Sequence, residues 1–340
     1  MKNSLYKKSL LSLKDINKNE IKKILLLSKK LKYLKKINKQ KSFLNGKKIV
    51  SIFELNSTRT RCAFEISAFD QKINITNLDV KNTHMGEKES IEDTIKIFNC
   101  MYDAIQYRGP SHKIIKEIKK YSTIPVWNAL TDKYHPIQIL SDLLTISEYS
   151  KYKENFSKIN LAYIGDCKNN IANTILEASN ILDIKINMIS NKKFLPSKKE
   201  INYIINSKKN KHTKIFCTED KEKGLKNIDF IYTDTWLSMN QNFRELDKKI
   251  KLLKKYQVNK NLLEKTKNQD IKILHCMPAI HDEKTELSKK IFKKFNIKNG
   301  LEITDDVFNS KNSLIFEQVK NKIYVIQAIM ILSLKKSVIF

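Results

Sequence analysis

The sequence predicts an α/β protein made of two doubly wound parallel-sheet domains. Short apolar runs rich in Ile, Val and Phe alternate with segments of helical spacing along most of the chain, as in βαβ units. The alternation pauses at a polar, lysine-rich stretch, residues 150–160, and then restarts. At 340 residues the chain is also long for one hydrophobic core. We therefore expect one domain over residues 1–149 and a second over residues 150–311.

The first half begins with an amphipathic helix, expected over residues 12–38, whose apolar positions recur among lysines. Strands are then expected at 49–53, 73–78, 103–108 and 124–129, and helices at 63–69, from 90, at 113–121 and at 136–146. Ser90 and Asp93 resemble a capping box, and Pro136 suits the first position of a helix. The polar stretch 81–89 is expected to be an exposed loop.

The second half repeats the alternation. Strands are expected at 161–165, 184–189, 214–218, 229–233 and 271–274, and helices at 171–182, 197–207 and 220–226. The segment 312–334 is apolar nearly all round, so it must be a buried helix. We expect it to pack back on the first domain, which would then include residues 312–340.

Arginine is scarce in this very basic chain. Only four of its 65 Lys and Arg residues are arginines, at positions 59, 61, 108 and 244, and the formal net charge is +29. Such a bias suggests an AT-rich genome in which surface arginines have become lysines. The arginines that remain then mark positions where a planar, bidentate donor is required. Two of the four lie in one five-residue turn.

That turn, Ser57-Thr58-Arg59-Thr60-Arg61, is placed where a buried strand ends and a helix begins. Unpaired backbone N–H groups and the helix dipole make such a place suitable for an anion. Three hydroxyl groups and two guanidinium groups add donors for phosphate oxygens. A serine N-cap followed by two solvated arginines is the simpler alternative, but the scarcity of arginine favours an oxyanion site.

Three more polar residues fall at the same predicted sheet edge. Arg108 ends a strand, and His135 and Gln138 flank the start of the helix that follows another strand. A histidine at a helix start is usually a cap or a surface residue when considered alone. Parallel sheets bind ligands at the carboxyl ends of their strands, so the convergence of these residues with Ser57–Arg61 favours a binding site.

In the second half, polar residues follow three strands in the same way. They are Asn169, Asp234, Ser238 and Cys276. A carboxylate with amide, hydroxyl and thiol neighbours suits a ligand that carries an ammonium group. The alternative is that Asp234 caps a helix and Cys276 is a small core residue.

Several classes of function are disfavoured. Five widely spaced cysteines without a C-x-x-C pair argue against a disulfide framework and for a reducing compartment, and the six histidines form no metal-binding motif. Six scattered glycines allow neither a dinucleotide fingerprint nor a P-loop, so we expect no cofactor and no metal. The lysines are scattered and no nucleic-acid-binding signature is present. With no signal-peptide or membrane-spanning pattern, a soluble cytoplasmic protein is expected.

Four motifs resemble those of the aspartate/ornithine transcarbamoylase family over essentially the whole chain. They are Ser57-Thr58-Arg59-Thr60-Arg61, His135-Pro136-Ile137-Gln138, Asp234-Thr235-Trp236-Leu237-Ser238-Met239 and His275-Cys276-Met277-Pro278. The first two are shared by the family and specify carbamoyl phosphate. The last two mark its ornithine carbamoyltransferase branch.

This resemblance implies transfer of the carbamoyl group of carbamoyl phosphate to the δ-amine of L-ornithine, giving L-citrulline and phosphate. It implies a homotrimer with each active site between two domains. It assigns the phosphate to Ser57, Thr58, Arg59 and Thr60, and the carbamoyl group to Arg108, His135 and Gln138. It assigns ornithine to Asn169, Asp234, Ser238 and Met239, with Cys276 and Met277 near the side-chain amine.

Three residues depart from the family pattern. His84 replaces a Gln in the loop that reaches the next subunit, Asn240 replaces a Gly, and Lys322 stands near a C-terminal Arg. Their family roles are not transferred here. Two alternatives remain open: a transcarbamoylase for another amine, such as putrescine or acetylornithine, and a basic scaffold or nucleic-acid binder on an inactive transcarbamoylase fold.

Overall fold

The computed structural model describes residues 3–206, 214–237 and 243–337. The chain divides into two compact units. The first comprises Met1–Thr145 and Val319–Phe340, and the second comprises Ile146–Gln318. In the described residues no helix is long and apolar enough to cross a membrane.

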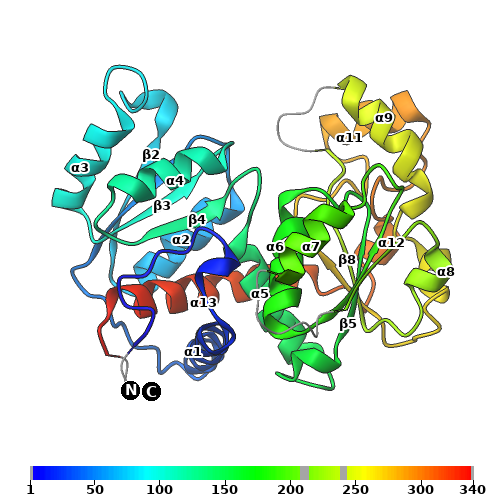
Figure 1. Ribbon diagram of the computed structural model, residues 1–340, viewed down its shortest axis with the longest axis horizontal. Helices are drawn as coiled ribbons and strands as arrows, with labels where there is room; N and C mark the ends of the chain where they lie inside the picture. Colours follow the sequence, from blue (N-terminus) through cyan, green and yellow to red (C-terminus); the bar gives the residue numbers. More distant parts are fainter. Residues whose placement is uncertain (1–2, 207–213, 238–242, 338–340) are drawn as a thin grey trace. The chain divides into compact units, whose positions relative to one another are not determined.

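The first unit contains a four-stranded sheet in the order β2-β1-β3-β4, with every neighbouring pair parallel (Figure 1). Its elements are α1 (Lys18–Lys36), β1 (Lys48–Phe53), α2 (Arg59–Asp70), β2 (Asn74–Asp79), α3 (Ile91–Met101), β3 (Ala104–Arg108), α4 (His112–Tyr121), β4 (Val126–Leu130) and the start of α5 (Pro136–Tyr149). The strand order reverses between β1 and β3, which makes this pair the switch point of the sheet.

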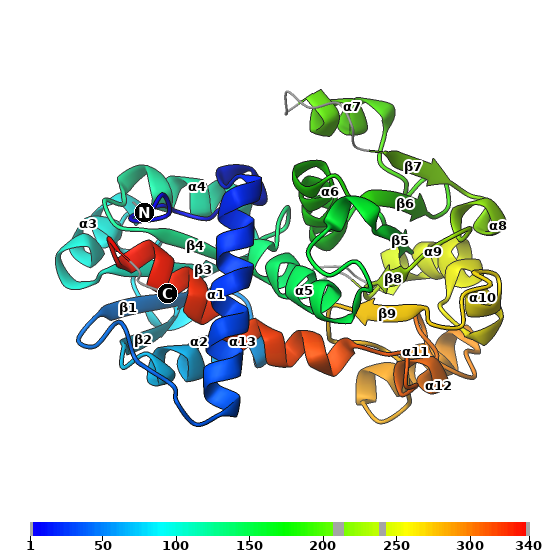
Figure 2. The same ribbon diagram turned by 90° about the horizontal axis from the view of Figure 1, so that it is seen from below.

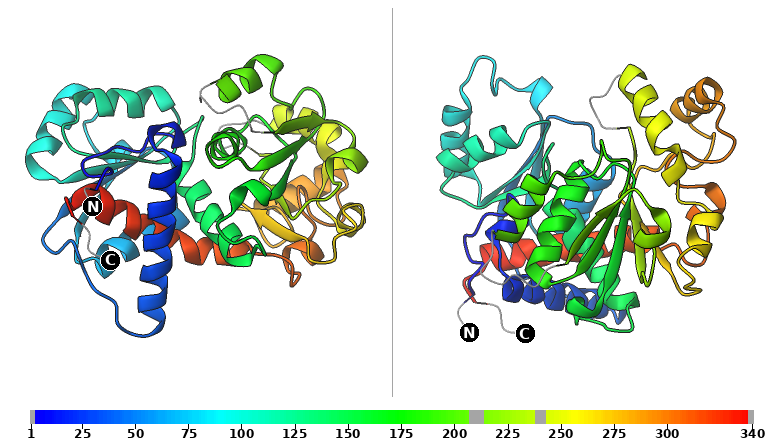
Figure 3. Two further views of the ribbon diagram at one scale, coloured as in Figure 1. Left: turned by 60° about the horizontal axis from the view of Figure 1, so that its bottom comes forward. Right: turned by 45° about the vertical axis from the view of Figure 1, so that its right-hand side comes forward.

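Helices cover both faces of the first sheet. On one face α3 and α4 pack on β1 and β3 through Val50, Ile52, Ile95, Ile115 and Ile118, all buried (Figure 2). On the other side α2 lies against α13 (Ile315–Leu334), where the Ser67 hydroxyl donates to the Ile323 carbonyl. The helix α1 crosses α13 (Figure 3, left), and Lys32 donates to Asn321 there. The expected return of the C-terminal helix is therefore observed.

The second unit contains a five-stranded parallel sheet in the order β7-β6-β5-β8-β9. Its strands and helices are β5 (Asn160–Ile164), α6 (Asn170–Leu182), β6 (Lys185–Ile189), α7 (Lys198–Asn206), β7 (Ile215–Thr218), α8 (Lys221–Gly224), β8 (Phe230–Thr233), α9 (Phe243–Leu253), α10 (Lys260–Glu264), β9 (Lys272–His275), α11 (Glu286–Phe295) and α12 (Asp305–Phe308). The switch point of this sheet lies between β5 and β8. Helices α6 and α7 lie on one face, and α9–α12 lie on the other (Figure 1).

The two doubly wound parallel sheets confirm the predicted fold class. Ser90 caps α3 by accepting from the Asp93 N–H, and Pro136 is the first residue of α5, as expected. The helix expected over 12–38 is shorter, because Asn17 and Glu20 form a capping box that starts α1 at Lys18. Helices α9, α10, α11 and α12 were not expected from the sequence.

Candidate active site

The turn between β1 and α2 has the predicted position. β1 ends at Phe53 and α2 begins at Arg59, with Ser57 and Thr58 immediately before the helix. Thr58 is the N-cap residue, and its side chain makes no capping hydrogen bond. The first backbone N–H groups of α2, at the positive end of its dipole, are therefore arranged as in an anion-binding helix start.

Arg108 lies beside this helix start. It ends β3, opposite Phe53 of β1 in the parallel register, so the switch point of the sheet brings it next to α2. Its guanidinium Nη1 is 3.4 Å from the Thr60 hydroxyl oxygen, and both residues are buried. A guanidinium here can donate to two oxygens of one ligand.

His135 and Gln138 stand at the next strand end, where β4 leads into α5. Both are buried, and the Gln138 amide is oriented by a 2.8 Å hydrogen bond from Nε2 to Asp142. Burial lowers the pKa of His135 well below its usual value, and the positive charges of Lys322, Arg108 and Arg59 lower it further. The imidazole is therefore neutral at physiological pH.

Lys322 of α13 completes this cationic cluster. Its ammonium donates to Gln138 Oε1 at 3.1 Å and to the Thr60 hydroxyl at 3.3 Å, and the residue is 6% exposed. No role was expected for Lys322 from the sequence. Its position shows that a buried ammonium lies among the residues predicted to bind carbamoyl phosphate. The sequence signal that could have pointed to Lys322 is that it stands near the C-terminal Arg of the family pattern, in the last helix.

Arg61 was expected to donate to phosphate oxygens together with Arg59, but the structure places its guanidinium elsewhere. Its guanidinium pairs with Asp79 at 2.5 Å and stacks over the Phe53 ring, 4.6 Å from the centroid. Residues two positions apart on a helix point in different directions, so Arg59 and Arg61 do not face the same ligand. The expectation that both guanidiniums of the turn serve the anion is corrected: Arg61 ties α2 to the end of β2.

In the second unit, Asn169 and Asp234 meet at the switch point between β5 and β8. Asn169 is the N-cap of α6, and its Oδ1 accepts from the Ala172 N–H at 2.8 Å and from the Tyr163 hydroxyl at 3.1 Å. Its Nδ2 then donates to Asp234 Oδ2 at 3.0 Å. The sequence-predicted pair is thus held in one orientation by hydrogen bonds.

Asp234 is a buried carboxyl group, 8% exposed. Burial raises its pKa to about 7, and the charges of Glu302 and Asp166 also raise it. His275 and a hydrogen bond from the Thr235 N–H act in the opposite direction. A carboxyl group that resists ionisation when its site holds no cation is suited to bind an ammonium group.

The end of β9 adds further residues to the second site. His275 is buried, with Nε2 3.2 Å from Glu302 Oε1, and Glu302 also accepts from the Ile280 N–H. Cys276 and Met277 follow directly and are half-buried. Glu302 lies far from any of the four motifs, so it was not expected at this site from the sequence. The predicted residues Ser238 and Met239, like Asn240, lie outside the described residues.

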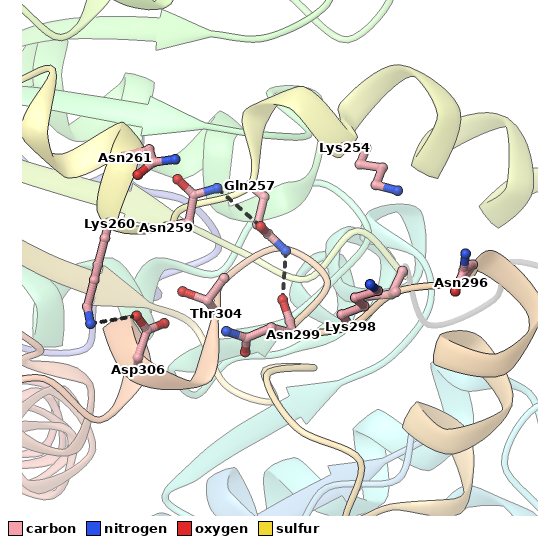
Figure 4. Close-up of a pocket in the computed structure, with 11 residues that line it drawn as sticks. Lys254, Gln257, Asn259, Lys260, Asn261, Asn296, Lys298, Asn299, Thr304 and Asp306 are labelled. Atoms are coloured by element: carbon pink, nitrogen blue, oxygen red, sulfur yellow. Dashed lines mark hydrogen bonds and ion pairs between the residues drawn. The ribbon is translucent and has the colours of Figure 1, made fainter.

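A pocket of about 580 Å³ in the second unit contains none of the predicted site residues that the structure describes (Figure 4). It lies between the α9–α10 connection and the segment 296–306. Gln257 donates to the carbonyls of Asn299 and Gly300, and Lys260 pairs with Asp306 at 3.2 Å. These contacts pair Gln257, Lys260 and Asp306 with other residues of the pocket wall.

The described residues include one group with metal-binding side chains: His281, Asp282 and Asp305. His281 Nδ1 is 2.7 Å from Asp305 Oδ1, and Lys284 pairs with Asp282 at 3.2 Å. These three side chains and Lys284 form an ion-pair network.

Comparisons with known proteins agree with this geometry. Residues 8–148 match the family description "Aspartate/ornithine carbamoyltransferase, carbamoyl-P binding domain", and residues 157–333 match "Aspartate/ornithine carbamoyltransferase, Asp/Orn binding domain". Ornithine carbamoyltransferase of Buchnera aphidicola subsp. Schizaphis graminum is 46% identical, with 99% of this chain and 100% of that protein covered. The corresponding protein of Blochmanniella floridana is 44% identical, with 98% and 95% covered.

Solved structures give the same result. Ornithine carbamoyltransferase from Pyrococcus furiosus superposes with a TM-score of 0.86 at 31% identity, covering 98% of this chain and 99% of that chain. Anabolic ornithine carbamoyltransferase from Campylobacter jejuni superposes with a TM-score of 0.80 at 30% identity, covering 95% and 97%. With both halves matched by family descriptions and relatives aligned nearly from end to end, this chain belongs to the aspartate/ornithine carbamoyltransferase family.

Proposed function

We propose that this protein is an ornithine carbamoyltransferase, which transfers the carbamoyl group of carbamoyl phosphate to the δ-amine of L-ornithine. In this proposal the first unit binds carbamoyl phosphate and the second binds ornithine. One observation carries it: the switch point of the first sheet gathers buried cationic groups, whereas the switch point of the second gathers buried acids. These charges match a dianionic donor and an amino-acid acceptor that carries ammonium groups.

Ser57, Thr58, Arg59 and Thr60 bind the phosphate group in this proposal. The helix start supplies N–H groups, and the hydroxyls and the guanidinium supply directed donors. Phosphate is also the leaving group, so the cationic groups stabilise the charge that accumulates on it as the bond to the carbonyl carbon breaks.

Arg108, His135 and Gln138 bind the carbamoyl group. When the amine attacks the carbonyl carbon, negative charge develops on the carbonyl oxygen, and donors fixed in advance stabilise it. Arg108 donates as a cation, and the neutral imidazole of His135 can donate one N–H. Because the Asp142 contact already holds the Gln138 amide, no reorganisation is needed at the moment of reaction.

Asn169, Asp234, Ser238 and Met239 bind ornithine, and Cys276 and Met277 lie near its side-chain amine. The δ-amine must lose a proton before its lone pair can attack. The C–N bond then forms, the C–O bond to phosphate breaks, and the amine releases a proton. We assign Asp234 and Cys276 to orienting the amine rather than to forming a covalent bond with substrate.

We further infer a homotrimer that acts in the cytoplasm in citrulline and arginine metabolism. Ile66 and Phe69, three positions apart on α2, expose 46% and 82% of their surfaces, and neighbouring exposed apolar side chains on one helix face favour a contact with another subunit. The five cysteines all lie in the described residues and none forms a disulfide bond, which fits a reducing compartment. Native mass spectrometry tests the trimer, and a monomeric mass would contradict it.

The direct test is citrulline formation from carbamoyl phosphate with L-ornithine, putrescine or N-acetylornithine as the acceptor. We expect turnover with ornithine alone. Arg59→Met should raise KM for carbamoyl phosphate, while the matched substitution Arg61→Met should leave it unchanged. If the enzyme turned over another amine and not ornithine, that amine would be the acceptor. Salt-sensitive polyanion binding without any carbamoyl transfer would contradict the proposal.

A further inference from the structure

A buried ion pair joins helix α9 to the sheet edge of the second unit. The Lys249 ammonium lies 2.6 Å from Asp166 Oδ2, and the side chains are 9% and 7% exposed. The same ammonium donates to the Trp236 carbonyl at 3.3 Å. One side chain of α9 therefore contacts the turn after β5, through Asp166, and the turn after β8, through Trp236.

Stability alone is a weak reason for such a pair, because burying two charges costs about as much as their attraction returns. In the same helix, Lys251 pairs with Asp247 at 3.3 Å, but there the side chains are 73% and 35% exposed. The exposed pair needs no explanation beyond a solvated helix face. The buried pair lies beside a predicted substrate group.

The two turns that Lys249 bridges are also the turns that hold Asn169 and Asp234. Gly165 and Trp236 pack so closely that a Cβ atom added at Gly165 would lie 2.7 Å from Trp236 Nε1. The Asn169–Asp234 hydrogen bond links the same turns a few residues further on. A change at Lys249 would therefore be transmitted to Asp234 through a short, well-packed path.

Lys249 also has an electrostatic effect on the ionisation of Asp234. The charge of Asp166 is one of the influences that raise the pKa of Asp234. The other titratable groups that face Asp234 are Glu302, His275 of β9 and Tyr163 of β5. By pairing with Asp166, Lys249 offsets part of the negative charge that opposes ionisation of Asp234.

We propose that Lys249 is a positioning residue for the acceptor substrate: it holds the turns after β5 and β8 together and neutralises Asp166 beside Asp234. This inference rests on the proposed function, because it assigns to Asp234 the binding of the acceptor. It makes two separable claims, one about geometry and one about charge.

The test measures kcat and KM for each substrate, and the pH profile of kcat/KM for ornithine, in the full-length protein. Lys249→Met should raise KM for ornithine by about tenfold to a hundredfold, because small displacements of a binding group have effects of this size. KM for carbamoyl phosphate should change little. The acidic limb of the pH profile should move to higher pH, because Asp166 then acts on Asp234 without its partner.

Three further variants separate charge from structure. Lys249→Arg should restore most of the ornithine KM, and the control Lys251→Met should match the wild type. The double variant Lys249→Met/Asp166→Asn should move the acidic limb to lower pH than Lys249→Met alone, because the repelling carboxylate is gone. The double variant leaves no buried charge unpaired, so it also serves as the test if Lys249→Met fails to fold. The titration of ornithine itself affects kcat/KM equally in the wild type and in every variant, so it cancels when their kcat/KM values are compared at the same pH.

Two results would overturn the inference. One is an acidic limb at the wild-type pH in both Lys249→Met and the double variant. The other is an equal rise in KM for both substrates, which indicates a general structural defect. A wild-type enzyme that makes no citrulline from ornithine is a distinct outcome, because it contradicts the proposed function itself before any variant is compared.

Discussion

His135 in the first unit and Asp234 in the second both lie at the carboxyl edge of a parallel sheet, His135 where β4 leads into α5 and Asp234 directly after β8. His135 is surrounded by the positive charges of Lys322, Arg108 and Arg59, and Asp234 by the negative charges of Glu302 and Asp166. In each case burial and like charges act in the same direction and favour the neutral form.

In each site, the charges of the protein are opposite in sign to the charge of the proposed ligand. Without ligand, like charges are held close together in a buried place, which is unfavourable. A dianion at the first site and a cation at the second relieve this repulsion. Carbamoyl phosphate should therefore raise the pKa of His135, and ornithine should lower the pKa of Asp234. The predictions below test this difference in charge between the two sites, starting with the largest expected effect.

Asp234→Asn should stabilise the free protein at alkaline pH while it removes ornithine turnover. The folded-state pKa of Asp234 is about 7, against an ordinary value of 3.8. Ionising the buried carboxyl group therefore opposes folding by up to about 4 kcal/mol above pH 7, and the penalty disappears as the pH falls toward 4.

Urea unfolding of both proteins at pH 4, 6 and 8 measures this effect. The stability advantage of Asp234→Asn should be near zero at pH 4 and should grow as the pH rises. If Asp234→Asn were less stable than the wild type at pH 8, Asp234 would be ionised in the free protein and stabilised by its neighbours. It would then differ from His135, whose surroundings favour the neutral form.

Arg108→Met should lower kcat by about a hundredfold to a thousandfold, the usual effect of removing one donor to a developing oxyanion. The fold should survive because Arg108 is the last residue of its strand. Steady-state kinetics of citrulline formation provide the measurement, with KM for ornithine as the internal control. A loss confined to KM for carbamoyl phosphate would assign Arg108 to ground-state binding instead.

The sequence was sufficient to find residues at or shortly beyond the end of an apolar run. Arg108 ends a recognisable strand, Asp234 directly follows one, and His135 lies in the connection after another, and parallel strands gather such residues at one edge. The fold class followed from the same alternation. These features are local, so they can be read from short windows of sequence.

Residues that reach the sites from elsewhere in the chain have no such local signal, and Lys322 was noticed only because it departs from the family pattern. Lys322 contacts Thr60 across 262 positions, and Lys249 contacts Asp166 across 83. In a chain with this many lysines, a buried ammonium cannot be told from a solvated one by its neighbours in sequence. Helix α9 was itself missed, so nothing pointed to Lys249. The direction of Arg61 depended on packing against Phe53 and Asp79.

Inorganic phosphate should stabilise the wild type, and Lys322→Met should weaken this effect. A ligand at 100 times its Kd adds about 2.7 kcal/mol of stability. Losing a buried ammonium next to Thr60 should lower phosphate affinity by about tenfold, or about 1.4 kcal/mol. Thermal unfolding across a phosphate titration checks this, with Lys320→Met as a control on the same helix. An unchanged phosphate dependence in Lys322→Met would place Lys322 outside the anion site.

Arg61→Met should have the smallest effect, because its ion pair with Asp79 is partly exposed and its stacking on Phe53 is a modest attraction. Contacts of these two kinds contribute about 0.5–1 kcal/mol each. We expect a loss of stability of about that size in urea unfolding, with KM for carbamoyl phosphate within about twofold of the wild type, since 0.4 kcal/mol corresponds to about a factor of two. Arg59→Met provides the matched comparison in the same turn, where KM should rise and stability should change little. If the two substitutions raised KM equally, both guanidiniums would serve the anion, and the cationic cluster of the first unit would extend further along α2 than its contacts show.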